Sequence, residues 1–79
     1  MPNTDIIKEI IHRYTQEPEE NITAEADFTK FKGCDSLAQV EIVIACEDEF
    51  NIAISDEESE VSTSLYALNR LIEKKKVAA

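Results

Sequence analysis

The segment from Leu37 to Phe50 carries apolar residues on two sides of one predicted helix. Since successive helical residues are turned by about 100°, one side collects the stripe expected to face the core: Gln39, Ile42, Val43, Cys46 and Phe50. A second stripe lies on roughly the opposite side: Leu37, Val40 and Ile44. A helix that packs on one core needs one apolar face. The second stripe therefore indicates either a docking surface or a helix buried on both sides.

Carboxylates favour the docking surface. Glu41 and Asp48 border the second stripe on one flank, and Glu47 borders it on the other. Apolar residues ringed by acidic ones are typical of surfaces that bind basic partner proteins. The alternative stays open from sequence alone, because a four-helix protein can enclose one helix between the others.

The overall charge limits the possible partners. The chain has 79 residues and a formal net charge of −9, which argues against nucleic-acid binding because that needs a basic surface. The span between Gly33 and Asn69 holds nine acidic residues and no lysine or arginine. Such a field would speed encounters with basic protein surfaces. The alternative is that it only keeps a small protein soluble.

A predicted helix start precedes the two stripes, and two polar residues there could cap it. Asp35 and Ser36 are both favoured N-caps, and Ser36-x-x-Gln39 fits a capping box with Ser36 as the cap. Gly33, the only glycine, is expected to let the chain turn tightly just before this start. A phosphate ester on the Ser36 hydroxyl would be stabilised by the positive end of the helix dipole. The plainer interpretation is that Ser36 is only a cap.

Several motifs follow one another along this part of the chain: Gly33-x-Asp35-Ser36-Leu37, Val40-Glu41, Glu47-Asp48-Glu49-Phe50, Ile54 and Asp56-Glu57-Glu58. Together they resemble the acyl carrier proteins, without a gap from about residue 22 to residue 72. The resemblance implies that Ser36 carries a 4′-phosphopantetheine arm through a phosphodiester bond. It also implies that Asp35 and Leu37 position the transferase that attaches the arm, and that partner enzymes recognise the helix after the serine.

The resemblance implies a carrier rather than an enzyme. A phosphopantetheinyl transferase would load the arm from coenzyme A. Acyltransferases, ketosynthases and other acyl-processing enzymes would then bind through basic patches to a wider docking face: Val40, Glu41, Ile44, Glu47 and Asp48. The sequence offers no Ser/His/Asp set, metal-ligand cluster or phosphate loop. The competing hypothesis is an acidic helical adaptor that carries no prosthetic group.

The segment Lys30-Phe31-Lys32 departs from the family, which usually has an acidic pair and a leucine before the glycine. Two lysines near Ser36 weaken the negative field there. Together with Ala38, which replaces a common acidic or polar residue, they favour a specialised lipid or polyketide-type pathway over general fatty-acid biosynthesis.

The whole chain predicts one all-α domain, a small four-helix bundle with three longer helices and one short helix. Apolar spacing predicts helices over about residues 3–16, 37–50 and 65–75. Ser55-x-x-Glu58 predicts a capping box for the short helix. We expect a long loop over about residues 17–35 and a frayed tail over about residues 76–79. The predicted core is Ile7, Ile10, Ile11, Tyr14, Ile22, Phe28, Ile42, Val43, Cys46, Phe50, Ile54, Leu65, Leu68 and Ile72.

Smaller features complete the prediction. Asn3 or Thr4 is expected to cap the first helix, and His12 is expected to be solvated without a functional role. Cys46 is expected to be buried and Cys34 partly exposed, which suits a reducing compartment. The sequence has no signal-peptide pattern and no apolar run long enough for a membrane span. We therefore expect a free-standing cytoplasmic monomer without a bound metal.

Overall fold

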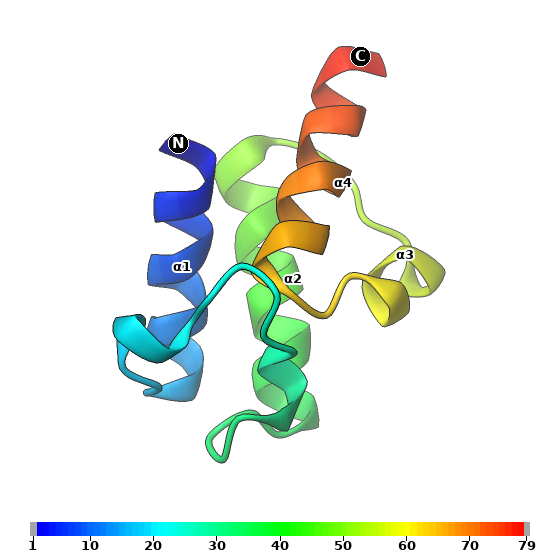
Figure 1. Ribbon diagram of the computed structural model, residues 1–79. Helices are drawn as coiled ribbons and strands as arrows, with labels where there is room; N and C mark the ends of the chain where they lie inside the picture. Colours follow the sequence, from blue (N-terminus) through cyan, green and yellow to red (C-terminus); the bar gives the residue numbers. More distant parts are fainter. Residues whose placement is uncertain (1, 79) are drawn as a thin grey trace.

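The chain folds into four α-helices and two short 3-10 helices, and the computed structural model describes residues 2–78 (Figure 1). The elements are α1 (Pro2–Thr15), η1 (Glu19–Asn21), η2 (Phe28–Lys30), α2 (Ser36–Phe50), α3 (Asp56–Val61) and α4 (Leu65–Ala78). Within the described range there is no β-strand, only an isolated bridge between Asp27 and Ser64. The predicted all-α bundle with three longer helices and one short helix is confirmed.

The core lies between α1, α2 and α4. α1 packs against both α2 and α4, and α3 lies apart on the side away from α1 (Figure 1). The largest fully buried side chains come from these three helices and the loop: Ile7, Ile11, Ile22, Phe28, Ile42, Cys46, Leu68 and Ile72. The predicted core is confirmed, although Tyr14, Val43 and Phe50 are only partly buried. Ala38 is also buried, which the sequence did not predict.

The ends of α1 differ from the prediction. Asn3 and Thr4 lie inside the helix, so the prediction that one of them caps it is wrong. The helix ends at Thr15 because Gln16 adopts a left-handed conformation with φ of 65°. His12 is half-buried, and its Nδ1 lies 2.6 Å from the carbonyl oxygen of Glu17. The prediction of a solvated histidine is therefore wrong, since the ring ties the helix end to the loop.

The loop between α1 and α2 is held by buried side chains and by backbone hydrogen bonds. Ile22 and Phe28 are almost fully buried, as predicted. The side chain of Asp27 caps η2 by accepting a hydrogen bond from Thr29 N at 3.0 Å. Phe28 N donates to Thr63 O at 2.9 Å. The loop is therefore fixed to the start of α4 and presents the start of α2 in a defined position.

The predicted tight turn at Gly33 is confirmed, because Cys34 N donates to Phe31 O at 3.0 Å across it, but Gly33 is needed for another reason. Its φ is not positive, so the backbone conformation does not require glycine. However, a Cβ atom at this position would overlap the carbonyl oxygen of Thr15. Glycine permits this close approach between the loop and the end of α1, and the approach places the residues that begin α2.

α3 begins at the cap that the sequence predicted. Ser55 and Glu58 form the predicted capping box, with hydrogen bonds of 3.0 and 3.1 Å. The same Glu58 carboxylate lies 2.9 Å from Lys75 Nζ, which joins α3 to α4. α3 itself contributes no buried residue. α4 continues to Ala78, beyond its predicted end near residue 75 and into the predicted frayed tail; Ala79 lies outside the described residues.

Candidate functional site

Asp35, and not Ser36, caps α2. The Asp35 carboxylate accepts a hydrogen bond from Ala38 N at 2.8 Å, and its carbonyl oxygen accepts one from Gln39 N at 3.1 Å. The predicted capping box with Ser36 as the cap is therefore wrong. The physical reason is the backbone: Asp35 is extended, with φ of −90° and ψ of −176°, whereas Ser36 already has helical geometry.

The corrected cap leaves the Ser36 hydroxyl free for chemistry. Ser36 is exposed, and its hydroxyl has no hydrogen-bond partner within residues 2–78. The backbone N–H groups of Ser36 and Leu37 are also unpaired there, as expected for the first turn of a helix. An exposed hydroxyl beside two free donors at the positive end of a helix dipole fits a phosphodiester anion.

The second apolar stripe of α2 faces away from the core. The side chains of Leu37, Val40 and Ile44 are 65%, 53% and 55% exposed. On the other side of the helix, Ile42 and Cys46 are completely buried. The alternative in which α2 is buried on both sides is therefore wrong.

A groove of about 410 Å³ runs from Ser36 between α2 and α3. Its lining joins apolar and polar side chains: Ser36, Gln39, Val40, Val43, Ile44, Glu47, Ile54, Asp56 and Ser59. The volume falls within the range of small-molecule sites in proteins. The sequence did not predict that Asp56 and Ser59 line this groove. No local pattern could have shown it, because it depends on how the link after α2 folds back.

Glu47 contributes to that fold-back. Its carboxylate accepts a hydrogen bond from Ile54 N at 2.7 Å, which joins α2 to the link before α3. The sequence assigned Glu47 to the docking face together with Glu41 and Asp48. The structure gives Glu47 a positioning role in the wall of the groove, and its docking role stays a prediction.

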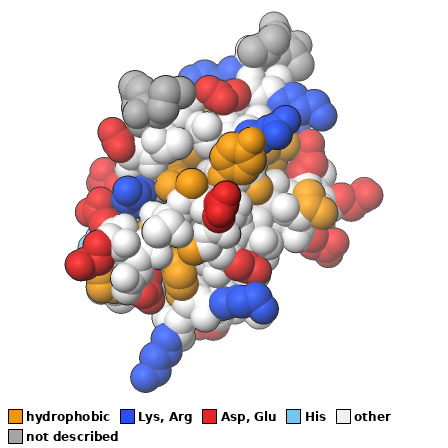
Figure 2. Space-filling model, in the orientation of Figure 1, with side chains coloured by type: hydrophobic (Ala, Val, Ile, Leu, Met, Phe, Trp, Pro, Cys, Tyr) orange, Lys and Arg blue, Asp and Glu red, His pale blue; other side chains and the backbone are white. Residues whose placement is uncertain are grey.

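Charges of both signs surround the site. Asp48 is exposed and Glu41 half-buried on α2, while Lys30 and Lys32 are exposed on the loop before it. Figure 2 shows basic side chains at the lower end of the molecule, where Figure 1 places this loop, and carboxylates along both sides. The field around Ser36 is therefore not uniformly acidic.

The thiol nearest to Ser36 is not activated. Cys34 is half-buried, and its Sγ lies 4.0 Å from the Asp35 carbonyl oxygen. Partial burial and the carboxylates of Asp35 and Asp27 raise the pKa of the Cys34 thiol. Because the thiolate is the reactive form, Cys34 is a poor nucleophile at neutral pH.

No residues from 2 to 78 are grouped so that three His, Cys, Asp or Glu side chains could hold a metal ion. In the same range, every helix is too short or too polar to cross a bilayer.

Comparison with known families identifies the chain. A family described as "Phosphopantetheine attachment site" matches residues 5–72, which is most of the sequence and includes all of α2 and α3. In this family, 4′-phosphopantetheine is bound covalently to a serine. The protein therefore belongs to the phosphopantetheine-attachment family and is a carrier protein of the acyl carrier type.

Proposed function

We propose that Ser36 is the attachment serine and that the protein carries acyl intermediates as thioesters between cytoplasmic biosynthetic enzymes without catalysing a reaction itself. The observation that carries this assignment is the free, exposed Ser36 hydroxyl in the first turn of α2, beside the α2–α3 groove. Asp35 supports it, because its side chain caps the helix and leaves the neighbouring hydroxyl without a structural task.

The protein contributes attachment, orientation and recognition. When bound, 4′-phosphopantetheine supplies a thiol on a flexible arm. The Ser36 Oγ supplies the oxygen of the phosphodiester, and the N–H groups of Ser36 and Leu37 stabilise the anion. Val43 and Ile54 give the adjacent groove an apolar wall. Such a wall suits an acyl group that moves from water into the groove.

The exposed stripe would bring the enzymes to Ser36. Leu37, Val40 and Ile44 offer the apolar centre of an interface, and Glu41 and Asp48 offer charges that attract basic patches. Such partners include the phosphopantetheinyl transferase, acyltransferases and ketosynthases. A monomer that visits several enzymes is consistent with a surface of this kind.

We assign the protein to a specialised lipid or polyketide-type pathway rather than to general fatty-acid biosynthesis. The support is the exposed pair Lys30 and Lys32 on the loop before Ser36. Enzymes whose basic surfaces recognise acidic residues on both sides of the serine would bind this carrier less well. The two lysines would face those basic surfaces, and like charges across an interface are unfavourable.

Mass spectrometry tests the attachment. The protein is incubated with coenzyme A, magnesium and a broad-specificity phosphopantetheinyl transferase, and the intact mass is measured. We expect the gain of one phosphopantetheinyl group, its loss in Ser36→Ala, and its retention in Ser59→Ala, a serine in the same groove. An unchanged mass with active transferase would instead support the acidic adaptor without a prosthetic group.

A further inference from the structure

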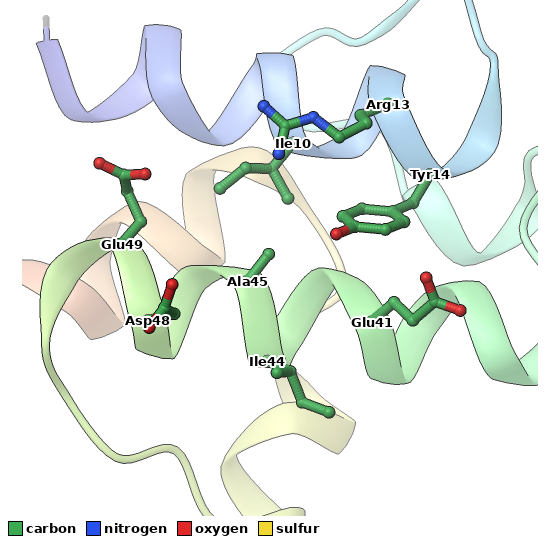
Figure 3. A pocket seen from close by; sticks show the side chains of 8 residues that line it. All are labelled: Ile10, Arg13, Tyr14, Glu41, Ile44, Ala45, Asp48 and Glu49. Carbon is green, nitrogen blue, oxygen red and sulfur yellow. The ribbon is translucent and has the colours of Figure 1, made fainter.

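A second groove lies between α1 and α2, outside the groove that starts at Ser36. It has a volume of about 340 Å³ and is lined from α1 by Ile10, Arg13 and Tyr14, and from α2 by Glu41, Ile44, Ala45, Asp48 and Glu49 (Figure 3). Only Ile44 lines both grooves. The two grooves therefore lie on either side of the exposed stripe of α2.

The α1–α2 groove has an apolar floor and carboxylate side chains at both ends. In Figure 3, Ile10 and Ala45 lie between the helices, with the Tyr14 ring beside them. The Glu41 carboxylate is at the Tyr14 end, and those of Asp48 and Glu49 are at the other end. A side chain of another molecule that complements this groove therefore combines an apolar stem with a positively charged end group.

The lining of this groove contains one cation, Arg13, and three carboxylates. Arg13 is the cation in the groove, and its guanidinium is paired with Glu9 at 3.1 Å, on its own helix. Glu41, Asp48 and Glu49 have no ion-pair partner in the described part of the chain. Since these carboxylates border a groove that admits a side chain, a cation from another molecule can approach those at either end of it.

Arginine matches the groove better than a small cation does. Its aliphatic stem can cover Ile10 and Ala45 while its head stays near the carboxylates. The planar guanidinium also stacks on aromatic faces such as the Tyr14 ring. A divalent metal ion needs several oxygen ligands within about 2.6 Å, and the described carboxylates form no such group.

From these observations we infer that the docking surface of α2 continues into the α1–α2 groove, where it receives an arginine side chain of a basic partner enzyme. The inference rests on the proposed carrier function, because Glu41, Ile44 and Asp48 belong both to the groove and to the proposed docking face. It adds α1 to that face: a partner helix lying along α2 would place one arginine against Tyr14 and Ile10.

Nuclear magnetic resonance with a defined probe tests the inference. The labelled full-length chain is titrated at low salt with an amphipathic helical peptide that carries arginine and leucine one helical turn apart. A second peptide replaces arginine with citrulline, which keeps the shape and removes the charge. We expect saturable shifts at Ile10, Tyr14 and Ala45 with the first peptide and much weaker shifts with the second.

Substitutions locate the binding site. Ala45→Leu fills the floor and should abolish the shifts, whereas Ala53→Leu, at an exposed position outside the groove, should not. Glu49→Gln should weaken binding by up to about fivefold, the limit for exposed ion pairs. Glu60→Gln makes the same change in charge on α3 and should have a smaller effect. Glu49→Gln alters only an exposed side chain, so it remains informative if Ala45→Leu disturbs the fold.

Several results would overturn the inference: no saturable shift, equal binding of the citrulline peptide, or shifts confined to the α2–α3 groove. Equal weakening by Glu49→Gln and Glu60→Gln would also overturn it, because the groove would then not be the site. The Ser36→Ala variant tests the peptide-binding inference separately from the proposed attachment of phosphopantetheine. It should lose phosphopantetheine loading and keep peptide binding, so a failure of the inference can be distinguished from a failure of the proposed function.

Discussion

Ile42 and Ile44 are the same residue type two positions apart on α2, yet they have opposite surroundings. Ile42 is completely buried against the core, whereas Ile44 is 55% exposed and lines both surface grooves. The inner face of α2 therefore holds the bundle together. The outer face keeps apolar side chains in water, which brings no comparable folding energy. Partner binding by the outer face explains why apolar side chains are kept there.

The largest effect should separate the two isoleucines. Ile42→Ala removes buried methyl groups and leaves a cavity, so we expect a loss of about 2–5 kcal/mol in the free energy of unfolding. Ile44→Ala removes mostly exposed atoms and should change stability by less than about 0.5 kcal/mol. Denaturant unfolding of both variants measures the difference. Similar losses in the two would show that the outer face also carries the fold.

The second prediction concerns partner recognition. Ile44→Arg and Glu41→Lys place positive charge on the outer face, where a basic partner would meet repulsion. We expect phosphopantetheine loading or later acyl transfer to slow by about tenfold, which corresponds to about 1.4 kcal/mol.

Circular dichroism is the control for these two variants. Because both side chains lie on the outer face of α2, helicity should stay near that of the unmodified protein. A variant that is largely unfolded would contradict the assignment of this face to docking, since it would show a structural role instead.

Substitutions of Asp35 test whether this residue caps α2, is recognised by the transferase, or does both. Asp35→Ala removes the acceptor for Ala38 N, so we expect a loss of about 1 kcal/mol in stability. Asp35→Asn should lose less, because asparagine is also a favoured N-cap. If loading falls in Asp35→Asn while stability is kept, the negative charge itself serves the transferase. Normal loading in Asp35→Asn would limit Asp35 to capping.

The sequence predicted what depends on local pattern. Apolar spacing predicted the buried position of Ile42, the flanking carboxylates favoured the outward position of Ile44, and polar spacing predicted the capping box at Ser55. It did not predict contacts that depend on chain geometry. Asp35 and Ser36 are equally good caps by composition, and only the backbone at Asp35 distinguishes them. The close approach of Gly33 to Thr15 and the bond from Ile54 N to Glu47 join residues that no short motif relates.

The buried Cys46 thiol gives a further test of the inner face of α2, with an effect that is absent at neutral pH. Burial, with the nearby Glu47 and Glu49 carboxylates, raises the pKa of Cys46 from 9.0 to about 12. In the unfolded chain the thiol ionises above about pH 9, while in the folded protein it keeps its proton until about pH 12. Between these values the folded state binds more protons, so stability falls as pH rises.

Cys46→Ala should remove that dependence, although its cavity lowers stability at every pH. We therefore expect the stability gap between the unmodified protein and Cys46→Ala to narrow from pH 9 towards pH 12, by up to about 1.4 kcal/mol per pH unit. Cys34, present in both proteins, cancels from the difference. A gap that stays constant over this range would mean that Cys46 ionises equally in both states. The inner face of α2 would then be less closed to water than its complete burial implies.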